Sequence, residues 1–211
     1  MKIIIDAMGG DYAPTEIVKG ALEAVEKLGV SIVLVGKTEQ ILRVLRGLGR
    51  GELPKGLELA NAEDVVDMSD DPVTVIKDRK DSSMVVALNM LRDGRGDGLI
   101  SAGSTGALIT ASTLLVKRIH GIRRATLAVE FPTANGHTLI ADAGANVECT
   151  PEYLLQFAYM GAFYMQRLHD LPKPRVGLLN IGVEETKGLP LQRQTYELLR
   201  QADGRGRISF V

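Results

Sequence analysis

Short apolar runs alternate with longer amphipathic stretches along the chain. The runs have the length of buried strands, and they lie at residues 3–7, 31–35, 57–60 and 98–101. The stretches between them carry apolar side chains at helical spacing, and they lie at residues 15–28, 38–48, 82–91 and about 105–119. The pattern predicts strands and helices that take turns along the chain.

Capping residues mark several of the expected helix ends. Thr15 is expected to cap the first helix and Gly29 to stop it, because a hydroxyl accepts a free N–H while glycine tolerates the left-handed turn. Asp81 or Ser82 is expected to cap the third predicted helix, at residues 82–91. A glycine-rich loop is predicted over residues 47–56.

The second half of the chain adds a different signal. Extended segments at residues 125–131 and 137–141 bracket the sequence Thr-Ala-Asn-Gly, whose Asn-Gly is typical of a hairpin turn. A long helix is predicted over residues 151–169, with Pro151 in its first turn, followed by a strand at 175–180 and a helix at 191–201. Residues 208–211 resemble a strand just begun, so we expect the chain to be truncated.

Strands that alternate with helices favour an α/β fold with a doubly wound, mostly parallel sheet and helices on both faces. The hairpin adds a local antiparallel element, and we expect one α/β domain over residues 1–211. Ligands of such sheets bind beyond the carboxyl ends of the strands. Chemistry is therefore expected in the loops after Ile5, Ile100, Ile140 and Ile181.

Composition excludes several classes of function. The formal net charge of -1 gives no reason to expect a nucleic-acid partner. The lone Cys149 forms no internal disulfide, suits a reducing cytoplasm and is expected to be structural, and the three scattered histidines offer no metal-ligand spacing. No apolar stretch approaches the roughly 18 residues of a membrane span, and the first apolar run is too short for a signal peptide. We expect a protein without cofactor or metal.

Two of the four loops combine glycine with polar side chains in a way that suits phosphate. The first holds Asp6, Gly9, Gly10 and Asp11, and it is either a tight turn with solvated acids or a place where backbone approaches a ligand. The second turns a strand into a helix through Ser101, Gly103, Ser104, Thr105 and Gly106. Its N–H groups and hydroxyls can form an anion site, while Ser104 or Thr105 can also simply cap the helix.

Three further segments are candidates of the same kind. The charged run that contains Lys80 and Ser82 is either a ligand contact or a solvated helix start. The loop after the hairpin holds Asp142, Gly144 and Asn146. The last loop holds Asn180, Gly182, Glu184 and Lys187, whose ammonium is either a point charge for a phosphoryl group or an ordinary surface lysine. Nucleotide P-loop, dinucleotide, serine-hydrolase and zincin motifs are missing from the sequence.

Six longer segments occur in order across nearly the whole chain: IIIDAMGGDYAP, VVDMSDDPV, KDSSMVVAL, SAGSTGAL, ADAGANVECTPE and PRVGLLNIGVEETKG. In combination they resemble the bacterial phosphate acyltransferases of phospholipid synthesis. That resemblance implies a sheet of the isocitrate and isopropylmalate dehydrogenase-like type, related to the phosphotransacetylases. The family usually carries Asn in place of Ser104 and continues well beyond residue 211.

The resemblance implies a reaction of acyl–acyl carrier protein with inorganic phosphate that gives acyl phosphate, the first step toward phosphatidic acid. Ser101, Gly103, Ser104, Thr105 and Gly106 would cradle phosphate. Lys187 with Asn180 would polarise the reacting groups, and Asp142 with Asn146 would organise them. The other candidate residues would help to bind phosphate or substrate.

An acidic carrier protein implies a basic landing surface, for which the sequence offers Lys117, Arg118, Arg123 and Arg124. The same cations can instead complement a helix C-terminus. A homodimer in the cytoplasm, peripheral contact with the inner face of the membrane and contact with a downstream glycerol-3-phosphate acyltransferase are implied by the resemblance alone. Three alternatives stay open: a phosphotransacetylase-like enzyme that uses acyl-CoA, an inactive fragment that serves as a binding partner, and a relative of the decarboxylating dehydrogenases.

Overall fold

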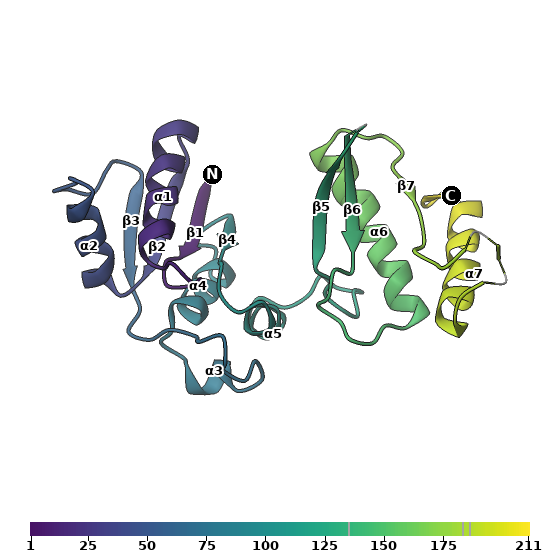
Figure 1. Cartoon of the computed structure of the whole chain (residues 1–211), viewed down its shortest axis with the longest axis horizontal. Helices are drawn as coiled ribbons and strands as arrows, with labels where there is room; N and C mark the ends of the chain where they lie inside the picture. The colour runs from purple at the N-terminus through teal and green to yellow at the C-terminus, as the bar shows by residue number, and fades with distance from the viewer. Residues whose placement is uncertain (135, 183, 186) are drawn as a thin grey trace. The chain divides into compact units, whose positions relative to one another are not determined.

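The computed structural model describes residues 1–134, 136–182, 184–185 and 187–211 (Figure 1). The chain divides into two compact units, Met1–Lys117 and Arg118–Val211. The elements of the first unit are β1 (Lys2–Asp6), α1 (Thr15–Leu28), β2 (Ser31–Gly36), α2 (Thr38–Gly47), β3 (Leu57–Asn61), α3 (Val75–Asp78), α4 (Ser83–Arg92), β4 (Gly98–Ile100) and α5 (Thr105–Leu115). Those of the second are β5 (Ala128–Thr133), β6 (Gly136–Ala141), α6 (Pro151–Leu168), β7 (Arg175–Val176), α7 (Pro190–Gly204) and β8 (Ser209–Phe210).

A parallel sheet with the strand order β3-β2-β1-β4 forms the centre of the first unit. Alternate side chains of its strands point to opposite faces, so each face has its own core. Ile5 and Leu34 pack in one core with Val18 of α1 and Ile41 of α2. Ile4 and its neighbours Val33 and Val35 pack on the other side with Ala87 and Met90, two residues of α4. The predicted doubly wound arrangement, with helices on both faces, is confirmed.

The strand order reverses between β1 and β4. From β1 the chain adds β2 and then β3 on one side, and it returns to place β4 on the other side of β1. The crevice at such a switch point is where open α/β sheets bind ligands. The loops after Asp6 and Ile100 therefore begin at the two strand ends that flank this crevice.

The second unit contains two small two-stranded sheets and two helices. β5 and β6 form the predicted antiparallel hairpin, with Thr133 opposite Gly136, while Asn135 of its turn lies outside the described residues. Figure 1 shows α6 running alongside this hairpin, and α6 contacts β6 and α7. Phe157 of α6 is 1% exposed, and Leu199 of α7 is 2% exposed. β7 and β8 pair in parallel.

Several predicted boundaries shift because a local hydrogen bond or a short partner decides them. Thr15 is the first helical residue, so Pro14 and not Thr15 occupies the N-cap. α5 ends at Leu115 and not near Ile119, because Lys117 takes a left-handed φ of 72° and its N–H bonds the carbonyl of Ser112. The predicted strand at 175–180 shortens to β7, since its partner β8 spans two residues. The short helix α3 was not predicted.

Other expected details are confirmed. Gly29 ends α1 with a left-handed φ of 63°. Ser82 caps α4, Ser104 caps α5, and Pro151 lies in the first turn of α6. Among the described residues, no helix is both long enough and apolar enough to cross a membrane.

Candidate functional site

The loops that follow β1 and β4 pack against each other through backbone and short side chains. Asp6 ends β1 and is 1% exposed. Its carboxylate accepts hydrogen bonds from the Ser101 hydroxyl at 2.7 Å and from the Met8 N–H at 3.2 Å. The Ser101 oxygen in turn accepts from the Gly103 N–H at 3.1 Å. Asp6 is thus a buried anchor that holds the second loop against the first.

Glycine at position 9 is what permits this approach. A Cβ built there would lie 2.7 Å from Asp6 Oδ2, 2.8 Å from the Gly103 nitrogen and 2.9 Å from Ser101 Oγ. Real Cβ atoms do not approach polar atoms so closely, so a side chain would push the two loops apart. Gly10 has a φ of 109°, a conformation that glycine favours, and it lies beside Ala102.

The second loop leads into α5 with its N-terminal N–H groups directed out of the helix. Ser104 is 7% exposed, and its hydroxyl accepts from the Ala107 N–H at 3.4 Å. The N–H groups of Thr105 and Gly106 belong to the first turn, which an α-helix leaves without partners of its own. α5 has no acidic side chain in that turn, so the positive end of its dipole is not offset locally. This end of the helix suits an anion.

A clamp of charged side chains fixes the segment that precedes α4. Arg79 lies 3.2 Å from both Asp64 and Asp70, and 3.8 Å from Asp67. The hydrogen bonds that Arg79 donates to Asp70 and Asp64 raise the pKa of its guanidinium. The pKa of Asp64 is lowered mainly by the Val65 N–H and then by Arg79.

This clamp bears on the candidate site through Pro72. A Cβ built at Gly106 would lie 3.1 Å from Pro72 Cγ, so the clamped segment borders the first turn of α5. The sequence interpretation treated residues 77–83 as a charged helix start and missed the clamp. Its signal was the spacing of three aspartates, at 64, 67 and 70, before one arginine.

In the second unit, the loop after β6 is organised around one carboxylate. Asp142 accepts from the N–H groups of Leu127 at 2.7 Å, Asn146 at 2.8 Å and Gly144 at 3.2 Å, and from the Thr126 hydroxyl at 3.0 Å. Burial raises the pKa of Asp142, but these hydrogen bonds outweigh it and leave the pKa below its ordinary value. Asp142 is therefore an ionised hub that holds the loop.

Asn146 extends that hub toward the basic segment. Its Oδ1 accepts from Arg124 Nε at 2.8 Å, and its Nδ2 donates to the Ala125 carbonyl at 2.9 Å. Cys149 lies in the same loop, where burial, followed by the negative charge of Asp142, raises the pKa of its thiol. A raised pKa disfavours the thiolate, which agrees with the structural role expected for this cysteine.

The last loop closes on itself. Asn180 Nδ2 donates to the Lys187 carbonyl at 3.1 Å, and the Lys187 N–H donates to the Glu184 carbonyl at 3.0 Å. Gly188 has a φ of 88° and packs on the Asn180 side chain. The Lys187 side chain is exposed. Val183 and Thr186 of this loop lie outside the described residues.

A family model described as "Fatty acid synthesis protein" matches residues 1–211. The chain belongs to this family. It is 46% identical over 202 residues to the phosphate acyltransferase of Desulfitobacterium hafniense strain DSM 10664, covering 96% of this chain and 60% of that protein. It is 46% identical over 211 residues to the phosphate acyltransferase of Desulforamulus reducens, covering 100% of this chain and 61% of that protein. The chain spans about 60% of the length of these curated relatives.

Solved phosphotransacetylases share the fold of this fatty acid synthesis family chain. The structure from Streptococcus pyogenes gives a TM-score of 0.73 at 16% sequence identity, and the match covers 100% of this chain and 67% of the phosphotransacetylase chain. The one from Staphylococcus aureus gives a TM-score of 0.70 at 14% identity, with the same coverage. At this identity the likeness establishes the fold, and the fold agrees with the one expected from the sequence.

The structure groups the predicted site residues of this family member into separate sets. Asp6, Gly9, Gly10, Ser101, Gly103 and Ser104 come together at the β1–β4 crevice, where Thr105 and Gly106 open α5. Asp11 and Lys80 are exposed. Ser82 is 0% exposed and its hydroxyl accepts from the Val85 N–H at 3.4 Å, so of its two predicted roles the structure supports the helix cap.

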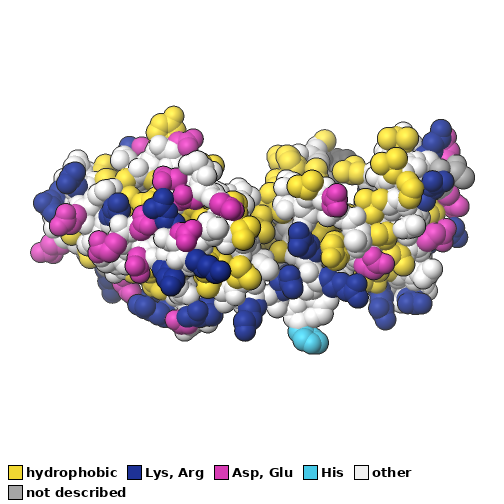
Figure 2. Space-filling view, turned by 90° about the horizontal axis from the view of Figure 1, so that it is seen from below, with side chains coloured by type: hydrophobic (Ala, Val, Ile, Leu, Met, Phe, Trp, Pro, Cys, Tyr) yellow, Lys and Arg dark blue, Asp and Glu magenta, His cyan; other side chains and the backbone are white. Residues whose placement is uncertain are grey.

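The residues of the predicted basic surface follow the end of α5 and do not belong to its helical turns. Lys117, Arg118 and Arg123 are exposed, but they follow the end of α5 in an irregular segment. Gln156 of α6 accepts from the Arg123 N–H at 2.8 Å and donates to the Gly121 carbonyl at 3.0 Å, which ties this segment to α6. On the face shown in Figure 2, the Lys and Arg side chains of the first unit, which lies on the left as in Figure 1, are interspersed with Asp and Glu.

The histidines show no metal-ligand spacing along the sequence, yet the structure brings two of them together. His137 and His169 lie far apart in sequence, yet their rings stack with centroids 4.6 Å apart beside Glu130. Sequence spacing carried no signal for this group, because a hairpin and a helix end bring its members together.

Proposed function

We propose that this chain carries the phosphate site of an acyltransferase that converts an acyl thioester and inorganic phosphate into acyl phosphate. The proposed thioester is acyl–acyl carrier protein. The observation that carries the proposal is the joining of the β1 and β4 loops at the switch point, through Gly9 and the Asp6–Ser101 hydrogen bond, beside the N-terminus of α5. The similarity to proteins named phosphate acyltransferase supports the same reaction.

The reaction makes modest demands on the protein. Inorganic phosphate is an anion at neutral pH, so its oxygen is already a nucleophile without a strong general base. That oxygen bonds to the thioester carbonyl carbon, the carbon–sulfur bond breaks, and the thiolate leaves and takes up a proton from water. A thiol pKa of about 8.5 makes it a good leaving group. Positioning and stabilisation of the oxyanion are what remain for the protein.

Residues of the first unit are assigned to phosphate. The N–H groups of Gly103, Thr105 and Gly106 and the hydroxyl groups of Ser104 and Thr105 are proposed donors, aided by the α5 dipole. Asp6 and Ser101 are proposed positioning residues, because each is occupied in joining the two loops. The remaining candidates of this unit, Gly10, Asp11 and Lys80, are proposed to line the path of the substrate.

Residues of the second unit are assigned to the thioester. Lys187, which is exposed, is proposed to supply a positive charge, and Asn180 holds its backbone. Asp142 and Asn146, with Gly144 between them, are proposed to keep the loop after β6 in shape. Gly182 and Glu184, in the same loop as Lys187, are proposed to contact the substrate. Arg118 and Arg123, together with Lys117 at the end of the first unit, are proposed to receive the acidic carrier protein, whereas Arg124 is engaged with Asn146. A cytoplasmic homodimer with peripheral membrane contact and a downstream acyltransferase partner completes this proposal.

The test is formation of acyl phosphate, trapped with hydroxylamine, from phosphate and acyl–acyl carrier protein. Ser104→Ala removes a proposed phosphate donor together with a helix cap, so the rate is expected to fall at least tenfold at subsaturating phosphate. Thr150→Ala is the matched control, because Thr150 caps α6 with the same 3.4 Å hydrogen bond. If both variants lose activity equally, the effect of Ser104 is one of stability, and the phosphate assignment fails.

A second candidate uses acyl-CoA as the thioester, and the phosphotransacetylase fold favours it. The two substrates separate the candidates. Turnover of acyl–acyl carrier protein that falls when Arg123 is reversed in charge supports the first candidate, because long-range attraction to an acidic partner is lost. Turnover of acyl-CoA alone supports the second. Binding of carrier protein without turnover of either substrate supports the fragment that serves as a binding partner.

A further inference from the structure

Glu130, His137 and His169 converge at one place in the second unit, although they come from three elements. Glu130 lies on β5 and His137 on β6. In the hairpin register Glu130 is opposite Leu139, and Pro132 is opposite His137, so the two side chains are diagonal neighbours on one face. Leu139 of that face packs against Gly161 of α6. The C-cap of the same helix is His169.

The ligand-type atoms of the three side chains point at a common volume. His137 Nδ1 lies 2.6 Å from Glu130 Oε1, and His169 Nε2 lies 3.0 Å from the same oxygen. The two imidazole rings stack with an interplanar angle of 24°. One nitrogen of each ring and one carboxylate oxygen all lie within 4.8 Å of one another. Small side-chain adjustments would place all three around one ion.

The existing contacts leave one of these atoms without a hydrogen bond. His169 Nε2 is buried and finds no hydrogen-bond partner in the part of the chain that the structure describes. Its 3.0 Å distance to Glu130 Oε1 is short enough, but the orientation does not make a hydrogen bond. In the tautomer that a metal binds, this nitrogen presents its lone pair to the carboxylate oxygen, and two acceptors so close repel each other. A cation that binds both atoms removes the repulsion and satisfies the buried nitrogen.

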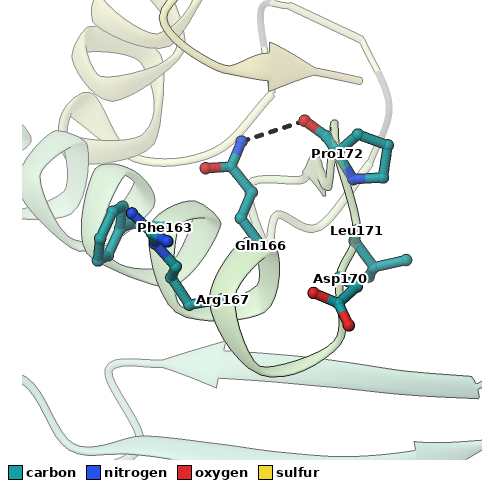
Figure 3. A pocket seen from close by; sticks show the side chains of 6 residues that line it. All are labelled: Phe163, Gln166, Arg167, Asp170, Leu171 and Pro172. Carbon is teal, nitrogen blue, oxygen red and sulfur yellow. Dashed lines mark hydrogen bonds between the residues drawn. The ribbon is translucent and has the colours of Figure 1, made fainter.

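Local structure holds His169 in position. The backbone N–H of His169 donates to the Met165 carbonyl at 3.1 Å, which continues the helix through the C-cap. Figure 3 shows Gln166 reaching over to the carbonyl of Pro172, and this 3.2 Å hydrogen bond ties the following turn to α6. A fixed ring is what a metal ligand requires.

We propose that Glu130, His137 and His169 bind one Zn²⁺ ion through the Glu130 carboxylate, His137 Nδ1 and His169 Nε2. Two imidazoles and a carboxylate suit zinc, with metal–ligand distances of about 2.0–2.2 Å. The side chains are 27%, 47% and 23% exposed respectively, which leaves room for a water molecule as the fourth ligand. Zn²⁺ coordinates imidazole nitrogens through their lone pairs and a carboxylate in its ionised form, so protons compete with the ion for these ligands. The ion would fasten the hairpin to the end of α6.

The test is a zinc titration of chelator-treated protein, in competition with a chromophoric zinc chelator. We expect one tight site per chain. His169→Ala, His137→Ala and Glu130→Gln are each expected to weaken binding at least tenfold, and Zn²⁺ is expected to raise the thermal unfolding midpoint of the wild-type protein only. Glu130→Gln keeps the shape of the side chain, so it reports on the ligand even where a histidine variant folds poorly.

Matched controls come from the same unit. His120→Ala removes the third histidine, which is exposed, and Cys149→Ser removes the only thiol. Both are expected to bind zinc like the wild type. The Co²⁺-substituted protein is expected to show visible bands of a four-coordinate site without a thiolate charge-transfer band. Unchanged affinity in His169→Ala and Glu130→Gln, loss of binding in Cys149→Ser, or no tight site in the wild type would each overturn the proposal.

Discussion

The two units hold their polar loops in different ways. In the first, the loop after β1 meets the loop after β4 because Gly9 has no side chain, and the buried Asp6 secures the contact. In the second, the loop after β6 is held by a charge, since Asp142 gathers four donors around one carboxylate. The contact between the β1 and β4 loops depends on the absence of a side chain at Gly9, whereas the loop after β6 depends on the negative charge of Asp142. The two are therefore expected to respond differently to substitution and to pH.

The largest effect is expected from Gly9→Ala. Its methyl group would overlap Asp6, Ser101 and the Gly103 nitrogen, so we expect a loss of about 3 kcal/mol in the free energy of unfolding. Chemical denaturation measures this loss. Gly20→Ala in α1 is the control, because its Cβ meets nothing within 4 Å and is expected to stabilise the helix by about 0.5–1 kcal/mol. Equal effects of the two changes would show that the loops do not depend on space.

Asp142→Asn is expected to have the next largest effect. The amide retains one acceptor oxygen but loses the charge, so several charge-assisted hydrogen bonds weaken and stability falls by about 2 kcal/mol at neutral pH. The urea midpoint measures it. Asp93→Asn serves as the control. The Asp93 side chain is exposed and, among the described residues, contacts only the adjacent Arg92. The free energy of unfolding is therefore expected to change by no more than about 0.5 kcal/mol.

The pH dependence separates the two units further. The folded-state pKa of Asp142 lies below its ordinary value of 3.8, so its stabilising contribution is complete above that pH. The contribution is lost as the pH falls through the lower folded-state value. Wild-type protein and Asp142→Asn are therefore expected to differ in stability at neutral pH and to converge in acid. Parallel curves down to the acid transition would show that Asp142 is not the hub.

The smallest effect is expected from the basic segment. Arg124→Ala removes the hydrogen bond from Nε to Asn146, which is solvent-accessible, so the expected loss is about 0.5 kcal/mol. Arg123→Ala is its neighbour and control, since the Arg123 contact to Gln156 is made by the backbone and survives the change. Thermal unfolding of both variants compares them. A larger loss for Arg123 would contradict the assigned contacts.

Regular elements of the first unit were predictable because each carries its own pattern. Apolar runs flanked by glycine gave the parallel strands, and helical spacing gave α1, α2 and α4. Where prediction failed, a short partner strand or a local hydrogen bond decided the outcome. The strand at 175–180 shortened to match β8, and α5 ended early at the left-handed Lys117.

The candidate site was predictable in its position and less so in its internal roles. The rule that ligands bind at strand ends selected the loops after β1 and β4, and their strands are neighbours at the switch point. Whether Asp6 faces a ligand or anchors a loop depends on which donors reach it, and Ser101 reaches it from 95 residues away. The Arg79 clamp was missed because its aspartate partners lie in a loop, where no periodic pattern indicates which side chains meet.

The sequence by itself determined the order of strands and helices, the glycines at the turns and the family resemblance, because these depend on local pattern and on residue identity. Only the tertiary structure decided which side chains share a hydrogen bond or lie close enough to bind one ion. Gly9 with Gly103, Asp142 with Leu127, and Glu130 with His137 and His169 are set by strand order, hairpin register and a helix end. Such distances are not encoded in spacing along the chain, since packing brings remote segments together.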